Sequence, residues 1–277
     1  MRNPLSKTIE QIKPSGIRKF FDIVSEMPHA ISLGVGEPDF DTPWHVRPEG
    51  IRSLEKGRTF YTSNSGLIEL RQEICKWYQR KYNVLYDYKT EALLTVGGSE
   101  GIDVALRAML DPGDEVIIPE PCYVSYVPCV QLIGAVPVTI ELKNENQFRL
   151  TPEELLAAIT DKTKILILAF PSNPTGAVMT KEDLEPIAKI CQEKDIYVIS
   201  DEIYSELTYG GQKHCSISSL PGMKERTVIV NSFSKSYAMT GWRIGFVAAP
   251  AEIVDRMTKC QENFNACANA PGQHAAT

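Results

Sequence analysis

Lys235 is the residue of this sequence best placed for covalent chemistry. It lies between two short apolar runs, 227–230 and 244–249, each of which predicts a buried β-strand. Hydroxyl side chains and an arginine stand around it, and this mixture suits an anion held beside a reactive amine. These neighbours are Ser232, Ser234, Ser236, Thr240 and Arg243. Taken alone, the same residues also fit an ordinary polar loop whose lysine points into water.

Polar and aromatic residues follow other apolar runs as well. The turn 97–100 has two adjacent glycines and opens a helix, whose free N–H groups favour a phosphate. Tyr123 follows a second run, where it is either a core tyrosine or a ring that stacks on a planar ligand. Asn173 and Asp201 follow two further runs. An acid in that position is an ion-pair partner, a helix N-cap or a group that holds a cationic ligand.

These segments are connected by a regular alternation of short apolar strands and amphipathic helices. Such an alternation is typical of a mostly parallel sheet covered on both faces, and therefore of an α/β fold. In such sheets ligands bind beyond the carboxyl ends of the strands, which is where the segments above fall. The expected strands are 93–96, 115–118, 136–140, 165–170, 196–200, 227–230 and 244–249, and the expected helices are 15–27, 67–78, 102–110, 152–159 and 181–194.

Five chemical requirements of pyridoxal 5'-phosphate are met by candidates at these strand ends. The cofactor needs an amine for a Schiff base, a carboxylate for its ring nitrogen, donors for its phenolic oxygen, an aromatic platform and a site for its phosphate. A Schiff-base lysine with an aspartate partner is the usual mark of such a site. The sequence therefore predicts a pyridoxal-phosphate site that includes Lys235 and Asp201.

Composition narrows the remaining function classes. The 277 residues carry a net charge of -6 spread in mixed sign, so no basic face indicates a nucleic acid or an anionic membrane as partner. The apolar runs are too short to cross a bilayer. The seven cysteines form no CxxC pair and the four histidines are dispersed, so we expect reduced thiols, a cytoplasmic protein and no metal site.

Six motifs, in this order, resemble the class I aminotransferases of the aspartate aminotransferase superfamily, which are pyridoxal-phosphate enzymes of fold type I. The likeness runs from about residue 15 to the last residue, and the motifs are GVGEPDFDTP, the segment 61–71, GGSEGI, SNPTGAV, VISDEIYSEL and SFSKSYAMTGWRIGF. It implies a three-layer sandwich around a mostly parallel seven-stranded sheet, and a homodimer. An N-terminal arm and helix, 1–40, would belong to a small domain, and 41–277 would form the cofactor-binding large domain.

The resemblance also implies roles for individual residues. Lys235 would form the Schiff base with the cofactor and shuttle a proton, while Asp201 would keep the ring nitrogen protonated. Tyr204 and Asn173 would bind the phenolic oxygen, and Tyr123 would stack on the ring, where many relatives have tryptophan. The phosphate would be held by Gly98, Ser99, Glu100, Ser232, Ser234 and Arg243, and by Tyr61 of the neighbouring subunit, whereas Gly36 and Asn173 would hold the substrate carboxylate.

Two departures from the family pattern bear on the substrate. Some relatives that act on aspartate have a lysine where this chain has Ser99, which weakens the case for aspartate and leaves aromatic, acidic and aliphatic donors open. The arginine that clamps the substrate's α-carboxylate would lie in a C-terminal domain beyond Thr277, and the start of the preceding long helix is expected at the chain end. Besides an aminotransferase for amino acids and 2-oxo acids, the sequence leaves open a β-lyase or decarboxylase on the same scaffold, and a truncated fragment without activity.

Overall fold

A seven-stranded sheet forms the centre of the computed structural model, which describes residues 2–14, 23–24, 26–27, 29, 31 and 36–277. The strand order is β1-β7-β6-β5-β4-β2-β3. Strands β1 to β6 run in one direction, and only β7 runs against its neighbours β6 and β1. The strands are β1 (Ala92–Thr95), β2 (Glu115–Glu120), β3 (Val136–Glu141), β4 (Thr163–Ala169), β5 (Tyr197–Asp201), β6 (Thr227–Ser232) and β7 (Gly245–Ala248).

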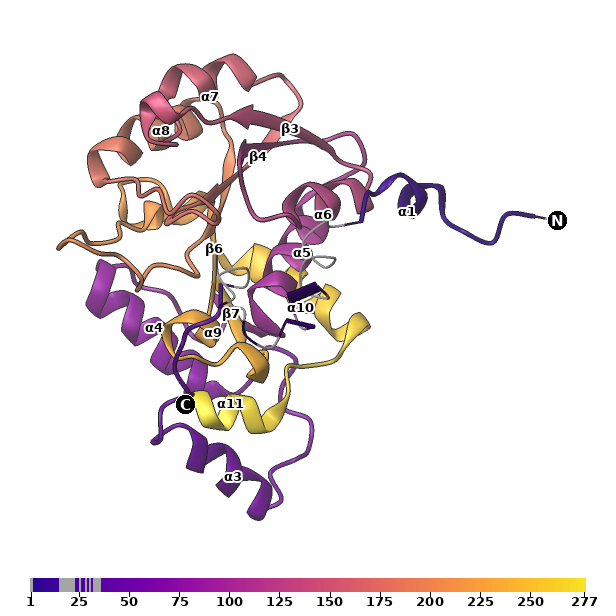
Figure 1. The fold of residues 1–277 in the computed structure, drawn as a ribbon, viewed down its shortest axis with the longest axis vertical. Helices are drawn as coiled ribbons and strands as arrows, with labels where there is room; N and C mark the ends of the chain where they lie inside the picture. The colour runs from indigo at the N-terminus through magenta and orange to yellow at the C-terminus, as the bar shows by residue number, and fades with distance from the viewer. Residues whose placement is uncertain (1, 15–22, 25, 28, 30, 32–35) are drawn as a thin grey trace.

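Helices cover both faces of this sheet (Figure 1). The α-helices are α1 (Lys7–Gln11), α3 (Arg47–Glu55), α4 (Ile68–Tyr82), α5 (Gly97–Met109), α6 (Tyr126–Leu132), α7 (Pro152–Ala158), α8 (Lys181–Glu193), α9 (Phe233–Ser236), α10 (Ala251–Phe264) and α11 (Ala270–Ala276). Short 3-10 turns are η1 (Asn144–Asn146), η2 (Ile217–Ser219), η3 (Lys224–Arg226) and η4 (Thr240–Trp242). The predicted α/β sandwich is confirmed.

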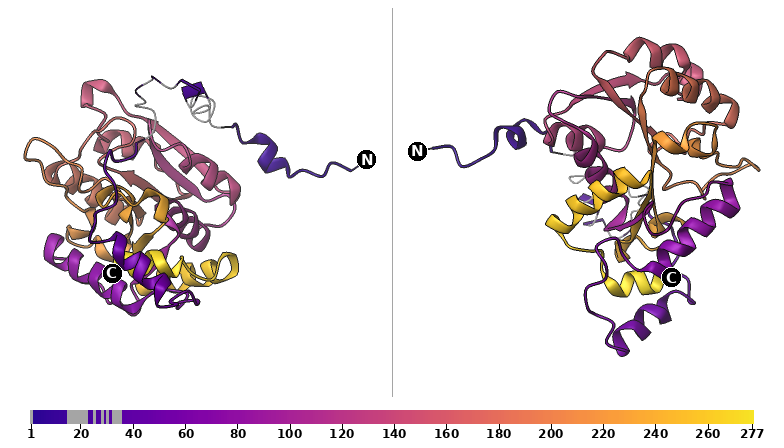
Figure 2. Two further views of the ribbon diagram at one scale, coloured as in Figure 1. Left: turned by 60° about the horizontal axis from the view of Figure 1, so that its bottom comes forward. Right: turned by 180° about the vertical axis from the view of Figure 1, so that it is seen from behind.

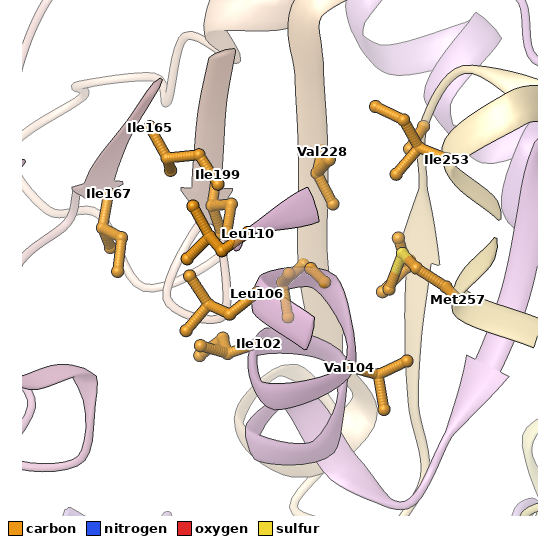
Figure 3. Close-up of a cluster of buried hydrophobic side chains, with 14 of the residues drawn as sticks. Ile102, Val104, Leu106, Leu110, Ile165, Ile167, Ile199, Val228, Ile253 and Met257 are labelled. Carbon is orange, nitrogen blue, oxygen red and sulfur yellow. The ribbon is translucent and has the colours of Figure 1, made fainter. Parts of the chain in front are cut away.

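The apolar strands are buried on both faces because successive side chains alternate between them. In β4, Ile165 and Ile167 face a core cluster with α5, α6 and α10, part of which Figure 3 shows. Leu166 and Leu168 face the other way, into a cluster with α7 and α8. Helix α4 packs with β1, β6 and β7 in a third cluster on that second face. Continuous apolar strands are therefore explained by two covered faces.

The seven predicted strands all exist, with boundaries that shift by one or two residues. The helix after β1 begins at Gly97, not at Ile102, so the two-glycine turn is itself the first turn of α5. The predicted helix 15–27 lies almost wholly outside the described residues. Helices α1, α3, α6, α9 and α10 were not predicted, whereas α11 lies at the chain end, where the start of a helix was expected. Helices α3 and α11 pack side by side at one end of the molecule, as two further views show (Figure 2).

Candidate active site

The carboxyl ends of β1, β2, β4, β5 and β6 lie at one edge of the sheet, because these strands run in the same direction. The predicted site residues that follow them are brought to that edge. Lys235 lies in α9, directly after β6. Ser232 is the N-cap of α9, since its hydroxyl accepts a hydrogen bond of 2.9 Å from the Ser234 N–H. The lysine is therefore held on an ordered turn.

Residues 36–43 pack onto the lysine turn, the segment 232–244 that contains Lys235 and joins β6 to β7. The Thr42 hydroxyl donates to the Ala238 carbonyl at 2.6 Å, and Trp242 Nε1 donates to the Thr42 hydroxyl at 3.0 Å. The Thr240 hydroxyl donates to the Glu37 carboxylate at 2.7 Å. These contacts place the predicted carboxylate-binding segment beside Lys235, although it is far away in the sequence.

Lys235 lines a cleft of about 550 Å³ between residues 36–43, Tyr204 and the lysine turn. Its Nζ donates to the Gly36 carbonyl at 2.5 Å and lies 5.8 Å from the centre of the Tyr204 ring. Burial lowers the pKa of Lys235, and Arg243 adds to this, while Glu37 opposes it. The amine is therefore closer to its neutral, nucleophilic form than a lysine in water.

Asp201 ends β5 and is 9% exposed. Its carboxylate accepts hydrogen bonds from the Tyr126 hydroxyl at 2.7 Å and from the Ile203 N–H at 3.1 Å. Burial raises the pKa of Asp201, and the bond from Tyr126 opposes that rise. A cation beside the carboxylate would favour its charged form, so the surroundings suit a protonated ring nitrogen.

Tyr126 is a member of this site that sequence reasoning missed. It stands at the start of α6, where its ring packs edge to face on Tyr123 with 5.6 Å between centres. Burial raises the pKa of Tyr204, and the neighbouring Asp201 and Tyr123 add to that rise. A hydrogen bond with the Asn173 side chain opposes it. The structure thus brings Tyr123, Asn173 and Tyr204 together near Asp201. The sequence gives no local signal for this role, because the Asp201 carboxylate that Tyr126 bonds lies 75 residues further along the chain.

Arg243 and the first turn of α5 form a corner suited to an anion. The space that a side chain on Gly97 would fill is taken by the Arg243 guanidinium, whose Nη2 lies 2.5 Å from an ideal Cβ position. Arg243 is held there with φ of 56°, and its Nη1 donates to the Thr240 carbonyl at 3.0 Å. A guanidinium next to free helix N–H groups is a favourable arrangement for a phosphate.

The other predicted phosphate ligands are placed less uniformly. Gly98 is buried and Ser99 is exposed in the first turn of α5. The Glu100 carboxylate accepts from the Val96 N–H and the Asn265 amide, so its side chain stabilises the helix start. The Ser232 hydroxyl lies 3.0 Å from the Ile244 carbonyl and 2.7 Å from the Ser234 hydroxyl. Both serines are therefore engaged within the lysine turn itself.

Among the described residues, no hydrogen bond ties Tyr61 to the sheet edge that carries Lys235 and Asp201. Its side chain is 87% exposed, and the described part of the chain gives its hydroxyl no hydrogen-bond partner.

Within residues 36–277 and the described N-terminal stretches, no three metal-ligating side chains cluster. In that same part of the chain no helix is long and apolar enough to span a bilayer.

Comparisons with a protein family, with individual proteins and with solved structures all point to aminotransferases. Residues 28–277 match the family described as aminotransferase class I and II. The chain is 47% identical to an aspartate aminotransferase of Pyrococcus abyssi and 45% identical to the aromatic-amino-acid aminotransferase 2 of Thermococcus litoralis, in each case over 98% of this chain and 70% of the relative.

The structure agrees with the sequence match. It superposes on the aspartate aminotransferase of Thermus thermophilus with maleate at a TM-score of 0.93 and 38% identity, covering 99% of this chain and 72% of that one. Identity at this level over nearly the whole chain, with a TM-score of 0.93, shows common ancestry and fold. The chain therefore belongs to the class I and II aminotransferases, the enzymes that move an amino group between an amino acid and a 2-oxo acid.

Proposed function

We propose that this chain binds pyridoxal 5'-phosphate through Lys235 and uses it to transfer an amino group from an L-amino acid to a 2-oxo acid. The observation that carries the proposal is the position of the Lys235 amine. It lies in an open cleft, 5.8 Å from the Tyr204 ring, and burial lowers its pKa. An amine of that kind is suited to attack an aldehyde.

The residues around Lys235 fit the chemistry of the cofactor. The guanidinium of Arg243 fills the space beside Gly97 at the start of α5, which suits a phosphate. The buried Asp201 carboxylate, held by Tyr126, suits a protonated ring nitrogen. Tyr204 and Asn173 would supply donors for the phenolic oxygen of the cofactor. We also propose that the phosphate is bound by Gly98, Ser99, Glu100, Ser232 and Ser234.

The bound cofactor would supply a ring that takes up the electron pair released at the substrate carbon. Each protein residue then has a task of its own. Asp201 would hold the ring-nitrogen proton, because a buried carboxylate favours a cation beside it. Lys235 would take a proton from the substrate carbon and return it, since burial lowers the pKa of its amine. Gly36 and Asn173 would hold the substrate carboxylate.

The proposal extends to the oligomeric state of the protein and to its domains. We propose a homodimer in which Tyr61 reaches the cofactor phosphate of the neighbouring subunit, and its exposed side chain is available for that contact. Residues 41–277 would form the cofactor-binding domain, and the arm before residue 41 would belong with a smaller one. A cytoplasmic location is part of the proposal.

Reduction with borohydride in the presence of pyridoxal phosphate, followed by peptide mapping, tests the central claim. We expect the stable label on Lys235 and none in a Lys235→Ala variant. A label on another lysine, or no label on the folded wild-type chain, would refute the proposal. Product analysis separates the rival chemistry, because transfer gives the oxo acid of the donor, whereas a β-lyase releases ammonia and pyruvate.

A further inference from the structure

Glu202 is a buried carboxylate that the proposed chemistry does not use. It follows Asp201 directly and is 0% exposed. Successive residues of an extended chain point to opposite faces of a sheet. In agreement, Asp201 is bonded by Tyr126 from α6, whereas Glu202 is bonded by Tyr78 from α4, on the other face. The two acids therefore lie on either side of the end of β5.

Four side chains surround the Glu202 carboxylate. It accepts hydrogen bonds from the Tyr78 hydroxyl at 3.1 Å, from the Ser200 hydroxyl at 3.1 Å and from the Ser216 hydroxyl at 2.5 Å. His214 Nε2 lies 3.5 Å from it, and the His214 side chain is 5% exposed. A fully buried carboxylate is costly unless it is hydrogen-bonded, and the three hydroxyl groups supply such bonds. This number of buried contacts to one carboxylate indicates that Glu202 has a structural role at the end of β5.

The hydrogen bonds lead from Glu202 to the lysine turn. The Tyr78 hydroxyl, which donates to Glu202, accepts from Asn231 Nδ2 at 3.4 Å. The Asn231 side-chain oxygen accepts from the Ser232 N–H at 2.7 Å. Ser232 is the N-cap of α9, the helix that contains Lys235. A continuous series of bonds thus joins the residue next to Asp201 to the residue that starts the lysine turn.

We propose that Glu202, Tyr78 and Asn231 position the ends of β5 and β6 relative to each other, so that Asp201 and Lys235 keep a fixed separation. The inference rests on the proposed function, in which those two residues hold opposite parts of one rigid cofactor. A site of that kind tolerates displacements of only about half an ångström, so residues behind it must fix the backbone that carries it. His214 packs against the carboxylate on which the series depends, with Nε2 at 3.5 Å.

Tyr78→Phe tests the inference, with Tyr86→Phe as a matched control. Both tyrosines are buried in one aromatic cluster, with 6.1 Å between their ring centres, and among the described residues the Tyr86 hydroxyl bonds neither Glu202 nor Asn231. The dissociation constant of pyridoxal phosphate is measured from the visible absorbance of the bound cofactor, and the stability of the cofactor-free chain from urea unfolding. Tyr78→Phe should weaken cofactor binding roughly two- to tenfold, the value of one buried hydrogen bond, and Tyr86→Phe less than twofold.

A double-mutant cycle with Asn231→Ser makes the test sharper. If the residues act in series, breaking the link at either end has the same effect, so the double variant should bind the cofactor no more weakly than the weaker single variant. Additive losses, or an unchanged dissociation constant in the folded Tyr78→Phe chain, would overturn the inference. If Tyr78→Phe does not fold, unchanged binding by Asn231→Ser overturns it equally. Failure of the wild-type chain to be labelled at Lys235 would instead refute the proposed function.

Discussion

Substituting Gly97 by alanine tests the anion corner directly. Gly97 has φ of 75°, and an added Cβ would lie 2.5 Å from Nη2 and 3.0 Å from Cζ of Arg243. Alanine in this left-handed conformation costs about 1–2 kcal/mol of stability. The guanidinium is the free end of a flexible side chain, so it would move rather than unfold the protein. It would then leave the start of α5.

The expected loss of affinity follows from that displacement. A hydrogen bond to a charged group contributes about 1.5–3 kcal/mol, which corresponds to a roughly tenfold to hundredfold weaker binding of pyridoxal phosphate. Pyridoxal, which lacks the phosphate, should bind the variant as it binds the wild type. Absorbance titrations with the two compounds measure both constants, and thermal unfolding should show a midpoint lower by a few degrees.

Gly113→Ala is the matched control for this substitution. Gly113 also has a positive φ, of 94°, but no atom lies within 4 Å of its added Cβ. The control should therefore lose similar stability and keep its affinity for pyridoxal phosphate. Equal loss of affinity in the two variants, or equal loss for pyridoxal and its phosphate in Gly97→Ala, would refute the assignment of Arg243 and the start of α5 to a phosphate.

Three further outcomes can be checked on the same protein. Burial raises the pKa of Asp201, so the cofactor-free chain loses stability as the pH rises from about 4 through that raised pKa, and the loss is constant above it. Asp201→Asn should therefore be more stable than wild type at about pH 7 but not near pH 3 in urea titrations; a difference independent of pH would contradict this. Burial lowers the pKa of Lys235, so its labelling by an amine-reactive reagent should begin to rise at a lower pH than the labelling of Lys189, whose side chain is 76% exposed. Equal pH midpoints for the two lysines would contradict this prediction. Tyr61→Phe should weaken cofactor binding in the proposed homodimer, and unchanged affinity would exclude that role.

Strand positions could be predicted from the sequence because both faces of the sheet are covered. The inner strands are then continuous apolar runs, and the turn residues that follow them mark the edge where a ligand binds. Lys235 and Asp201 were found in this way, and the structure places both at that edge. Local sequence sufficed to place each of them directly after a strand.

The contacts behind these residues could not be predicted in the same way. Tyr126 in α6 bonds Asp201 at the end of β5, and this contact between residues far apart in the sequence has no local signal. The hydroxyl of Ser232 looked like a phosphate ligand, but the sequence does not distinguish such a ligand from an N-cap, and the structure shows the N-cap bond. Short polar side chains serve both purposes equally well.

The reversed strand β7 has a consequence for the order of folding. It pairs with β6 from Ser232 to Gly245 directly across the lysine turn, whereas its pairing with β1 joins residues as distant as Ala92 and Ala248. Contacts between residues close in sequence close a smaller loop and form sooner than distant ones. We therefore expect the lysine turn to form as a local hairpin, onto which the glycine turn of α5 docks later, so that Lys235 and Arg243 are in place before the helix start that completes the anion corner.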